Sequence, residues 1–282
     1  MTAIRLRSMT GRWAAAFIAM VVAAGCAADA EDATSDNGET VHIHEVLVED
    51  DGTVLLATHL GLRRVSGDGL ELVGTRRHDL MAATIDGDTL LASGHPELGD
   101  DSLRVVDRPP LLGLVQSDDG ETWSARSLLG EADFHGLVIA DGQLFAANSS
   151  ESAIWVSKDA GETWQPRSGK VQLTAFAVHP EQVSRMIGVD LDRGLVRSAD
   201  GGETWSDLDG PALVDLEWTT DGVVGLDEDG SVHRFRSETW SVSDGVDDIA
   251  ALGRQDDEIY AFSFPSTVLR SGDGGTTWQS IP

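Results

Sequence analysis

The side chains best suited to chemistry in this 282-residue sequence are its eight histidines. Six of them lie at the ends of stretches rich in β-branched and aliphatic residues, where strands begin or end. Imidazole nitrogens that converge with carboxylates can bind Zn²⁺ or Cu²⁺. We therefore expect a divalent metal site, zinc or copper, with these candidate ligands: His42, His44, His59, His95 and His135.

Two carboxylates accompany the last of these histidines. Glu131 and Asp133 precede His135 at a spacing of two, so all three would point to one side of an extended segment. Carboxylate pairs also hydrolyse glycosidic bonds, and Glu131 or Asp133 with a partner such as Asp79 is a candidate catalytic pair. The sequence leaves three interpretations open: a metal site, another ligand-binding or catalytic pocket, and histidines that only bond backbone carbonyls.

The elements that must position these side chains follow from a phrase that returns four times. The tryptophans that end its first three copies, Trp123, Trp164 and Trp205, are 41 residues apart. Ser and Asp side chains bond to their own backbone, and Gly supplies the positive φ of a tight turn. A period near 40 in a strand-rich sequence indicates the blades of a β-propeller. The four copies are Gln116–Trp123, Ser157–Trp164, Ser198–Trp205 and Ser271–Trp278.

The phrase resembles the Asp-box, or BNR repeat, with the pattern S-x-D-x-G-x-T-W, and the first copy departs from it with Gln116 in the serine position. The resemblance implies that each copy lies on the turn between the third and fourth strands of a blade. About 242 residues at a period near 40 predict an all-β, six-bladed β-propeller, although seven blades would also fit. The resemblance does not fix the function, because sialidases, other glycosidases, sorting receptors and photosystem assembly factors all carry this motif. We expect the boxes to be structural and not to bind calcium, because each Asp is occupied by its own turn.

Strand order predicts where the histidines gather. The four strands of a blade alternate in direction, with the first strand nearest the central channel. First strands therefore begin on the same face where second strands end, which we call the upper face. The insertion 96–110 falls on this face, between the second and third strands of blade two. Six histidines are predicted there over blades one to three, while His179 and His233 fall elsewhere; the six are His42, His44, His59, His78, His95 and His135.

The N-terminal residues predict export. Residues 1–25 have three arginines and then an apolar run that is short for a membrane span, which is typical of a signal peptide. Ala23–Cys26 resembles the bacterial lipobox, which implies that Cys26 is the lipidated first residue of the mature protein. Residues 26–40 are small, polar and acidic and are expected to form a flexible tether, followed by the propeller domain, 41–282. We expect the protein to be lipid-anchored on the extracytoplasmic face of the cell membrane.

The net charge limits the partners. A formal charge of −28 repels phosphate backbones, which argues against nucleic acid as a partner, and favours cations and cationic ligands. The single cysteine excludes an internal disulfide. We expect a monomer whose partners are the membrane, through its lipid, and a metal ion, glycan or protein ligand.

Five further stretches are together similar to a group of exported bacterial Asp-box proteins, many of them lipoproteins, labelled glycosylhydrolase-like or exo-α-sialidase-like. They are Val41–His44, Ala57–Leu62, Ser93–Pro96, Pro109–Leu114 and Ser127–His135.

The catalytic residues of a sialidase are not evident in this sequence. Sialidases use a tyrosine nucleophile, an acid/base aspartate and three arginines. The one tyrosine, Tyr260, lies in an apolar strand where a packing role is expected, and Arg63 and Arg64 fall on a third strand away from the channel. We therefore expect a lipoprotein that binds a metal ion, small ligand or partner through its His-rich upper face. The alternative is a sialidase-like or other glycoside hydrolase acting on extracellular glycan.

Overall fold

The fold is an all-β propeller of six blades. The computed structural model describes residues 41–67, 69–244 and 246–281. The secondary structure of these residues consists of strands, which form six four-stranded antiparallel sheets. The predicted fold class and the count of six blades are confirmed. The predicted signal peptide, Cys26 and the tether lie outside the described residues.

The strands of the first three blades are as follows. Blade 1 contains β1 (Ile43–Val48), β2 (Val54–Thr58), β3 (Gly61–Ser66) and β4 (Gly69–Leu72). Blade 2 contains β5 (Asp79–Asp86), β6 (Thr89–His95), β7 (Leu114–Ser117) and β8 (Ser124–Ser127). Blade 3 contains β9 (Phe134–Ala140), β10 (Gln143–Asn148), β11 (Ala153–Ser157) and β12 (Gln165–Pro166).

The last three blades repeat the pattern. Blade 4 contains β13 (Leu173–Val178), β14 (Met186–Asp190), β15 (Gly194–Ser198) and β16 (Ser206–Asp207). Blade 5 contains β17 (Asp215–Thr219), β18 (Gly222–Leu226), β19 (Val232–Arg236) and β20 (Thr239–Val242). Blade 6 contains β21 (Ala251–Gln255), β22 (Glu258–Ser263), β23 (Thr267–Ser271) and β24 (Gln279–Ile281).

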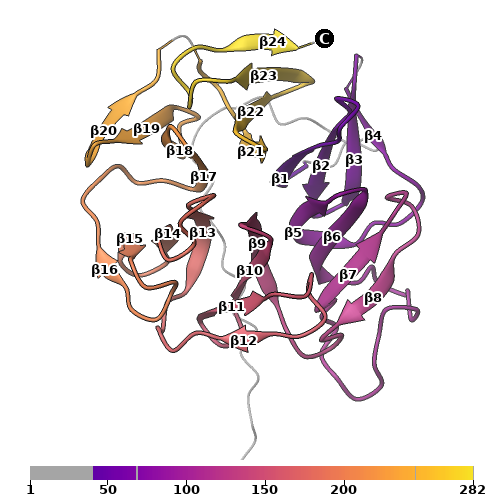
Figure 1. Cartoon of the computed structure of the whole chain (residues 1–282). Coiled ribbons are helices and arrows are strands. Elements are labelled where there is room, and N and C mark those ends of the chain that lie inside the picture. Colours follow the sequence, from indigo (N-terminus) through magenta and orange to yellow (C-terminus); the bar gives the residue numbers. More distant parts are fainter. Residues whose placement is uncertain (1–40, 68, 245, 282) are drawn as a thin grey trace, which may run out of the picture.

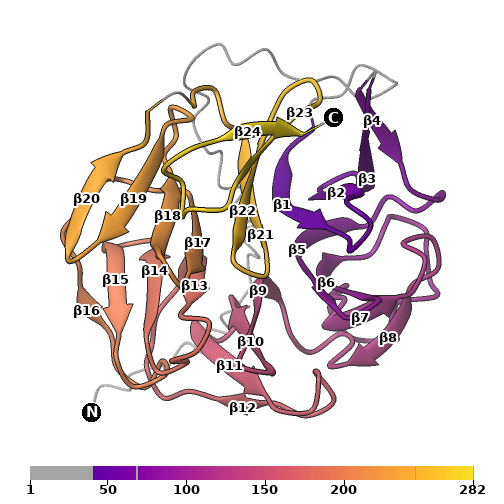
Figure 2. The same cartoon turned by 45° about the horizontal axis from the view of Figure 1, so that its top comes forward.

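The blades surround a central axis, with the first strand of each blade innermost (Figures 1 and 2). The ring closes where β1 packs beside β21. The last strand, β24, pairs with β23 of its own blade, so within the described residues the first and last blades exchange no strand. Packing of β1 against β21 and a hydrogen bond from Gln255 Nε2 to Asp50 Oδ1 (3.4 Å) join the two ends of the ring. No helix in the described part of the chain is long and apolar enough to cross a membrane.

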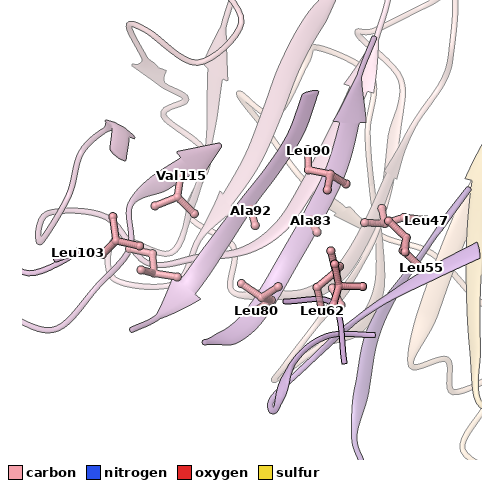
Figure 3. Close-up of a cluster of buried hydrophobic side chains, with 12 residues drawn as sticks. Leu47, Leu55, Leu62, Leu80, Ala83, Leu90, Ala92, Leu103 and Val115 are labelled. Carbon is pink, nitrogen blue, oxygen red and sulfur yellow. The ribbon is translucent and has the colours of Figure 1, made fainter. Parts of the chain in front are cut away.

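The core lies between adjacent blades. Along β1 the side chains alternate: Leu47 packs in the cluster between blades 1 and 2, and Val46 and Val48 pack in the cluster between blades 6 and 1. Figure 3 shows the first of these clusters, in which Leu47 lies near Leu55 of β2 and the cluster continues to Leu80 of β5. Complete burial of one such side chain contributes about 1.5–3 kcal/mol. Each first strand is therefore fixed from both sides, which gives the channel a rigid wall.

The later repeated turns share one hydrogen-bond pattern. In the turn between β15 and β16, the Asp200 carboxylate accepts the Thr204 N–H (2.9 Å) and the Thr204 hydroxyl (2.6 Å). Ser198 Oγ accepts the Gly202 N–H at 2.9 Å. The copies at Ser157–Trp164 and Ser271–Trp278 make the matching bonds, also between third and fourth strands. The carboxylate oxygens of these turns are occupied by their own backbone and hydroxyl groups.

The first copy differs from the prediction, which placed Gln116 in the serine position of the motif. Ser117 Oγ bonds to the Asp119 carboxylate (3.0 Å) and accepts the Gly120 N–H (2.8 Å). The serine role therefore belongs to Ser117, and the spacing from Ser to Gly is three residues instead of four. Gln116 instead accepts a hydrogen bond from Arg126 on the neighbouring strand β8.

Candidate functional site

A cavity of about 1000 Å³ runs along the propeller axis. Residues from the first strands of all six blades line it, and at its upper mouth the lining includes His42, His44 and His135. The volume lies at the upper end of the range of about 300–1000 Å³ that is usual for ligand pockets. The sequence-based placement of these three histidines near a channel mouth agrees with their positions in the structure.

Histidines and aspartates of blades 1 to 3 alternate around this mouth. His44 Nε2 lies 3.6 Å from Asp79 Oδ1, and Asp79 Oδ2 lies 3.5 Å from His95 Nδ1. His95 Nε2 lies 3.8 Å from Asp133 Oδ1, which lies 3.1 Å from His135 Nε2. We call these five residues the His–Asp chain. It brings together three of the predicted metal ligands and two of the carboxylates singled out from the sequence.

At the blade 1 end of the His–Asp chain, two buried polar atoms face each other without a hydrogen bond. His44 Nε2 and Asp79 Oδ1 have no hydrogen-bond partner among the described residues, and their separation of 3.6 Å is too long for one. A buried polar group without a partner typically costs about 1–3 kcal/mol. Both atoms retain their capacity to bind a ligand.

The charges of the His–Asp chain are mutually stabilising. Burial alone would raise the pKa of Asp79, but the adjoining rings of His44 and His95 outweigh it and hold that pKa well below its ordinary value. The contact with Asp79 raises the pKa of His95, against the effect of burial. Burial lowers the pKa of His42, and the neighbouring His44 lowers it further. The two imidazole rings therefore favour the ionised form of the Asp79 carboxyl group.

Irregular strand pairing determines the orientation of two of these histidines, His44 and His135. Ile43 pairs with Thr58 and the next pair starts at Glu45, so His44 is an extra residue on β1. On β9, His135 and the following glycine lie between successive paired residues in the same way. Such β-bulges turn a side chain away from the strict alternation of a strand. The side chains of β1 therefore do not alternate strictly across this bulge. The rings of His42 and His44 are nevertheless in contact, with centroids 4.8 Å apart.

Two residues predicted for the site have other partners. His59 Nδ1 accepts the His42 N–H at 3.0 Å, and the His59 N–H donates to the His42 carbonyl at 3.3 Å, so His59 ties the start of β1 to the end of β2. Glu131 does not lie on an extended segment beside Asp133. Its N–H closes a turn, and its carboxylate pairs with Arg108 of the insertion 96–110.

The remaining three histidines lie outside the His–Asp chain. His78 is buried on the upper side, and its Nδ1 accepts the Glu97 N–H at 3.0 Å. His179 accepts backbone N–H groups in a lower turn of blade 4. His233 on β19 lies 2.6 Å from Asp227. Each has a local structural partner.

The cavity wall also carries a group of charges that the sequence analysis did not single out. Glu45 on β1, Glu217 on β17 and Arg254 on β21 all line the cavity. Arg254 Nε lies 3.7 Å from Glu217 Oε2, and Arg254 Nη2 donates to the Ile139 carbonyl on β9 at 3.1 Å. Because β9 belongs to the blade opposite β21, the Arg254 side chain reaches across the channel. The available sequence signal was a charged residue in the middle of otherwise apolar first strands.

These acids are shifted toward the neutral form. Burial raises the pKa of Glu45, and the neighbouring Glu217 and Asp215 raise it further. Burial also raises the pKa of Glu217, which Arg254 partly offsets. Asp215 has its pKa raised by burial, while its carboxylate accepts the N–H groups of Leu216 (2.7 Å) and Leu252 (2.9 Å). Asp215 thus joins the first strands of blades 5 and 6.

Tyr260 is not among the residues that line the cavity, where a catalytic nucleophile would be needed. It is buried on β22, the second strand of blade 6, within the core between blades 6 and 1. Its hydroxyl donates to Glu258 Oε2 at 3.0 Å. The packing role expected for Tyr260 agrees with this position, and Arg63 is likewise buried on the third strand β3.

Among the described residues, no three His, Cys, Asp or Glu side chains already surround one point as metal ligands do. The His–Asp chain is extended along the rim, since His95 uses its two nitrogens toward two different carboxylates.

The sequence matches no family model and no curated protein. Several solved propellers are similar in structure. The WD40 propeller domain of Doa1 is 16% identical with a TM-score of 0.55, covering 86% of this chain and 83% of that one. Virginiamycin B lyase from Staphylococcus aureus is 10% identical with a TM-score of 0.52, covering 86% and 84%. The GH74 xyloglucanase from Xanthomonas campestris is 19% identical with a TM-score of 0.51, covering 86% of this chain and 38% of that one. At these identities the likeness establishes the propeller fold alone.

Proposed function

We propose that the protein is a non-catalytic binding propeller whose upper mouth binds a divalent metal ion through His44, Asp79 and His95. The observation that carries this proposal is the facing pair of buried, unpartnered atoms, His44 Nε2 and Asp79 Oδ1. An imidazole nitrogen and a carboxylate oxygen are ordinary ligands of Zn²⁺. Asp133 and His135 would then hold His95 from the other side.

The spacing of the donor atoms supports a shared cation. Zinc bonds of about 2.0–2.1 Å in a tetrahedral site place neighbouring donor atoms about 3.3–3.4 Å apart. His44 Nε2 lies 3.6 Å from Asp79 Oδ1 and His95 Nδ1 lies 3.5 Å from Asp79 Oδ2, so each imidazole faces a different oxygen at a separation longer than a hydrogen bond. A shared ion would require side-chain rotations that bring both imidazoles to this carboxylate.

Two features favour binding over glycan hydrolysis. Among the described residues that line the cavity, the aromatic side chains apart from histidine reduce to Phe176, so a stacking platform for a sugar ring is lacking in that lining. The suggested catalytic Glu131 is paired with Arg108.

We propose further that this binding domain is displayed on the extracytoplasmic face of the membrane by a lipid on Cys26. The support is the N-terminal sequence alone. Mass spectrometry of the protein isolated from membranes should show a diacylglycerol-bearing Cys26 as the first residue, and a Cys26→Ser variant should be released. An unlipidated N-terminus elsewhere would contradict this.

Metal analysis of the purified protein, after separate loading with Zn²⁺ and Cu²⁺ and removal of free metal, tests the proposed site. We expect nearly one ion per chain in the parent and less than a tenth of that in His44→Ala and in His95→Ala. His233→Ala is the matched control, because it removes a histidine that also contacts an aspartate but lies on blade 5. A parent protein that retains neither metal, or equal retention in all three variants with the fold intact, would overturn the proposal.

A further inference from the structure

The exposed large apolar side chains of the described residues all lie on the upper face. Three of them belong to the insertion 96–110, which follows the upper end of β6. The other three follow β14, precede β17 and end β20, and strand direction places each of these points on the same face. The two most exposed, Leu98 (93%) and Val106 (87%), are both in the insertion. The whole set is Leu98, Val105, Val106, Leu191, Val214 and Val242.

The insertion presents Leu98 and Val106 to the outside although it is tied to the propeller at other points. Leu103, between them in the chain, is buried in the core cluster between blades 1 and 2. The buried Asp100 carboxylate lies 3.0 Å from Arg76 Nη1, on the segment that joins β4 to β5. The exposure of Leu98 and Val106 is therefore a property of the folded surface.

The insertion is close to neutral in a strongly acidic protein. Four arginines lie in or beside it against five carboxylates, so the region contributes −1 (4 − 5) to the formal charge of −28. Two of these arginines are paired within the region, one with Asp100 and one with Glu131. Electrostatic repulsion from an anionic surface is therefore weak at this loop. The charged residues are Arg76, Arg77, Arg104 and Arg108, with Glu97, Asp100, Asp101, Asp107 and Glu131.

The chain also enters the propeller on the upper face. The described residues begin at Val41, directly before the upper start of β1 in blade 1, next to the blade that carries the insertion. A lipid on Cys26, as proposed above, is attached 15 residues earlier, and 15 residues span at most about 54 Å. Such an anchor joins the propeller to the bilayer by the same face that exposes the apolar side chains.

We propose that the insertion 96–110 docks the propeller onto the lipid bilayer, with Leu98 and Val106 in the interfacial region. The proposal rests on the proposed lipid anchor, and it goes beyond the anchor by assigning the face that meets the membrane. A stable protein interface needs about 800 Å² of surface from each partner. Affinity for a bilayer interface instead grows with whatever apolar area enters it, and the anchor keeps this loop at a high local concentration beside the membrane.

Photo-crosslinking on vesicles tests this contact. Phosphatidylcholine vesicles contain a maleimide-headgroup lipid, which captures the thiol of the single cysteine, Cys26, and a lipid with a diazirine in its acyl chain. The protein is the unlipidated chain from Cys26 onward, which contains all the described residues. We expect at least fivefold more cross-links at residues 98 and 105–107 than in the lower turn 86–88 of the same blade. Leu98→Ser/Val106→Ser should reduce labelling of the insertion at least fivefold.

Val242→Ser is the matched control, because it removes an exposed apolar side chain of the same face from blade 5 and should leave the labelling unchanged. Equal labelling of the insertion and the lower turn would overturn the proposal. Labelling that persists in Leu98→Ser/Val106→Ser would overturn it too, since the tether alone would then explain the proximity. Self-association without vesicles that the double variant abolishes would assign the loop to a second copy of this chain and would likewise overturn it.

The failure of docking and the failure of the natural anchor are distinguishable. Maleimide capture supplies the tether whether or not Cys26 carries a lipid in the cell, so a loss of cross-links reports on the insertion alone. The mass of the N-terminal peptide from membranes reports on the lipid alone.

Discussion

At the scale of single residues, the cavity is lined by carboxyl groups whose ionisation is unfavourable because they are buried. Glu217 has its pKa raised by burial, so the native protein holds its proton to higher pH than the unfolded chain does. Wherever the native state binds more protons, stability falls as pH rises. The contribution of Glu217 is thus most favourable below the unfolded pKa of about 4.3, and it is lost as pH rises through the native pKa.

We predict that Glu217→Gln removes part of this pH dependence. The variant should gain thermal stability relative to the parent at pH 8 and show little gain at pH 5, because glutamine has no charge to bury. Melting temperatures at the two pH values measure it. Glu71→Gln, at the exposed position of β4, should change neither value. A gain at pH 5 as large as that at pH 8 would show that ionisation of Glu217 is not the cause.

The aspartates of the repeated turns are shifted in the opposite direction. Hydrogen bonds from the Thr204 hydroxyl and N–H lower the pKa of Asp200 to about 2, although the group faces solvent. A lowered native pKa stabilises the fold above the unfolded pKa of about 3.9, and this stabilisation is lost as pH falls through the native value.

Carboxyl carbon NMR should therefore place the midpoint of Asp200 near pH 2. Thr204→Val, which removes the hydroxyl donor and keeps the N–H, should raise that midpoint, and Thr204→Ser should restore it. An unchanged midpoint in Thr204→Val would mean that the Thr204 N–H and the Ser198 hydroxyl hold the carboxylate without the Thr204 hydroxyl.

At the scale of elements, a serine hydroxyl joins neighbouring blades at two places, buried at Ser243 and half-buried at Ser127. Ser243 Oγ donates to the Gly275 carbonyl and accepts the Trp278 indole N–H at 3.2 Å, which links the outer edge of blade 5 to the last repeated turn. Ser127 contacts Trp164 in the same manner, with the indole N–H 3.0 Å away. The tryptophan of each of these turns is thus fixed by the preceding blade.

We predict that Ser243→Ala lowers the free energy of unfolding by about 1–3 kcal/mol, because it leaves a buried carbonyl and an indole N–H without this partner. Denaturant titration measures the change. Ser206→Ala on the exposed strand β16 should stay within about 0.5 kcal/mol of the parent. Equal stability of Ser243→Ala and the parent would contradict an anchoring role for this contact.

The blades could be predicted from the sequence because each carries its own local signals. Turn chemistry and apolar alternation act over a few residues, so the repeated phrase located the third and fourth strands and, by strand order, the upper face. The serine position of the first turn was assigned wrongly to Gln116, because the motif spacing favours Gln116. The hydrogen bonds in the structure show that Ser117 takes this role.

The site could be predicted only in part. That His44, His95 and His135 meet at one mouth follows from strand direction. The orientation of the His44 and His135 side chains does not follow from strand direction. It depends on β-bulges in β1 and β9, which the residue types do not predict. The approach of Arg254 to Glu217 and to the opposite blade depends on how six separate strands close into a ring, which local patterns do not encode.

At the scale of the whole molecule, the ring depends on a seam between blades 6 and 1 that, within residues 41–67, 69–244 and 246–281, no shared strand holds together. Gly253 on β21 lies against the backbone of Val46 on β1, and a Cβ at this position would collide with the Val46 carbonyl. The seam is also apolar, since Val46 and Ala251 belong to the buried cluster between these blades. The close approach of these two backbones is thus one of the contacts that close the ring in the described residues.

Gly253→Ala should therefore open the ring locally and lower the free energy of unfolding by at least about 1–3 kcal/mol, since a backbone atom cannot move aside as a side-chain end can. Gly272→Ala is the control in the same blade, because the nearest atom to its added Cβ is a Glu258 carboxylate oxygen at 3.7 Å. Hydrogen exchange should become faster along β1 and β21 in Gly253→Ala and stay unchanged in β9 and β10 of the opposite blade. Uniformly faster exchange would mean that the ring opens as one unit, and unchanged exchange would mean that the seam tolerates a methyl group and that closure does not depend on Gly253.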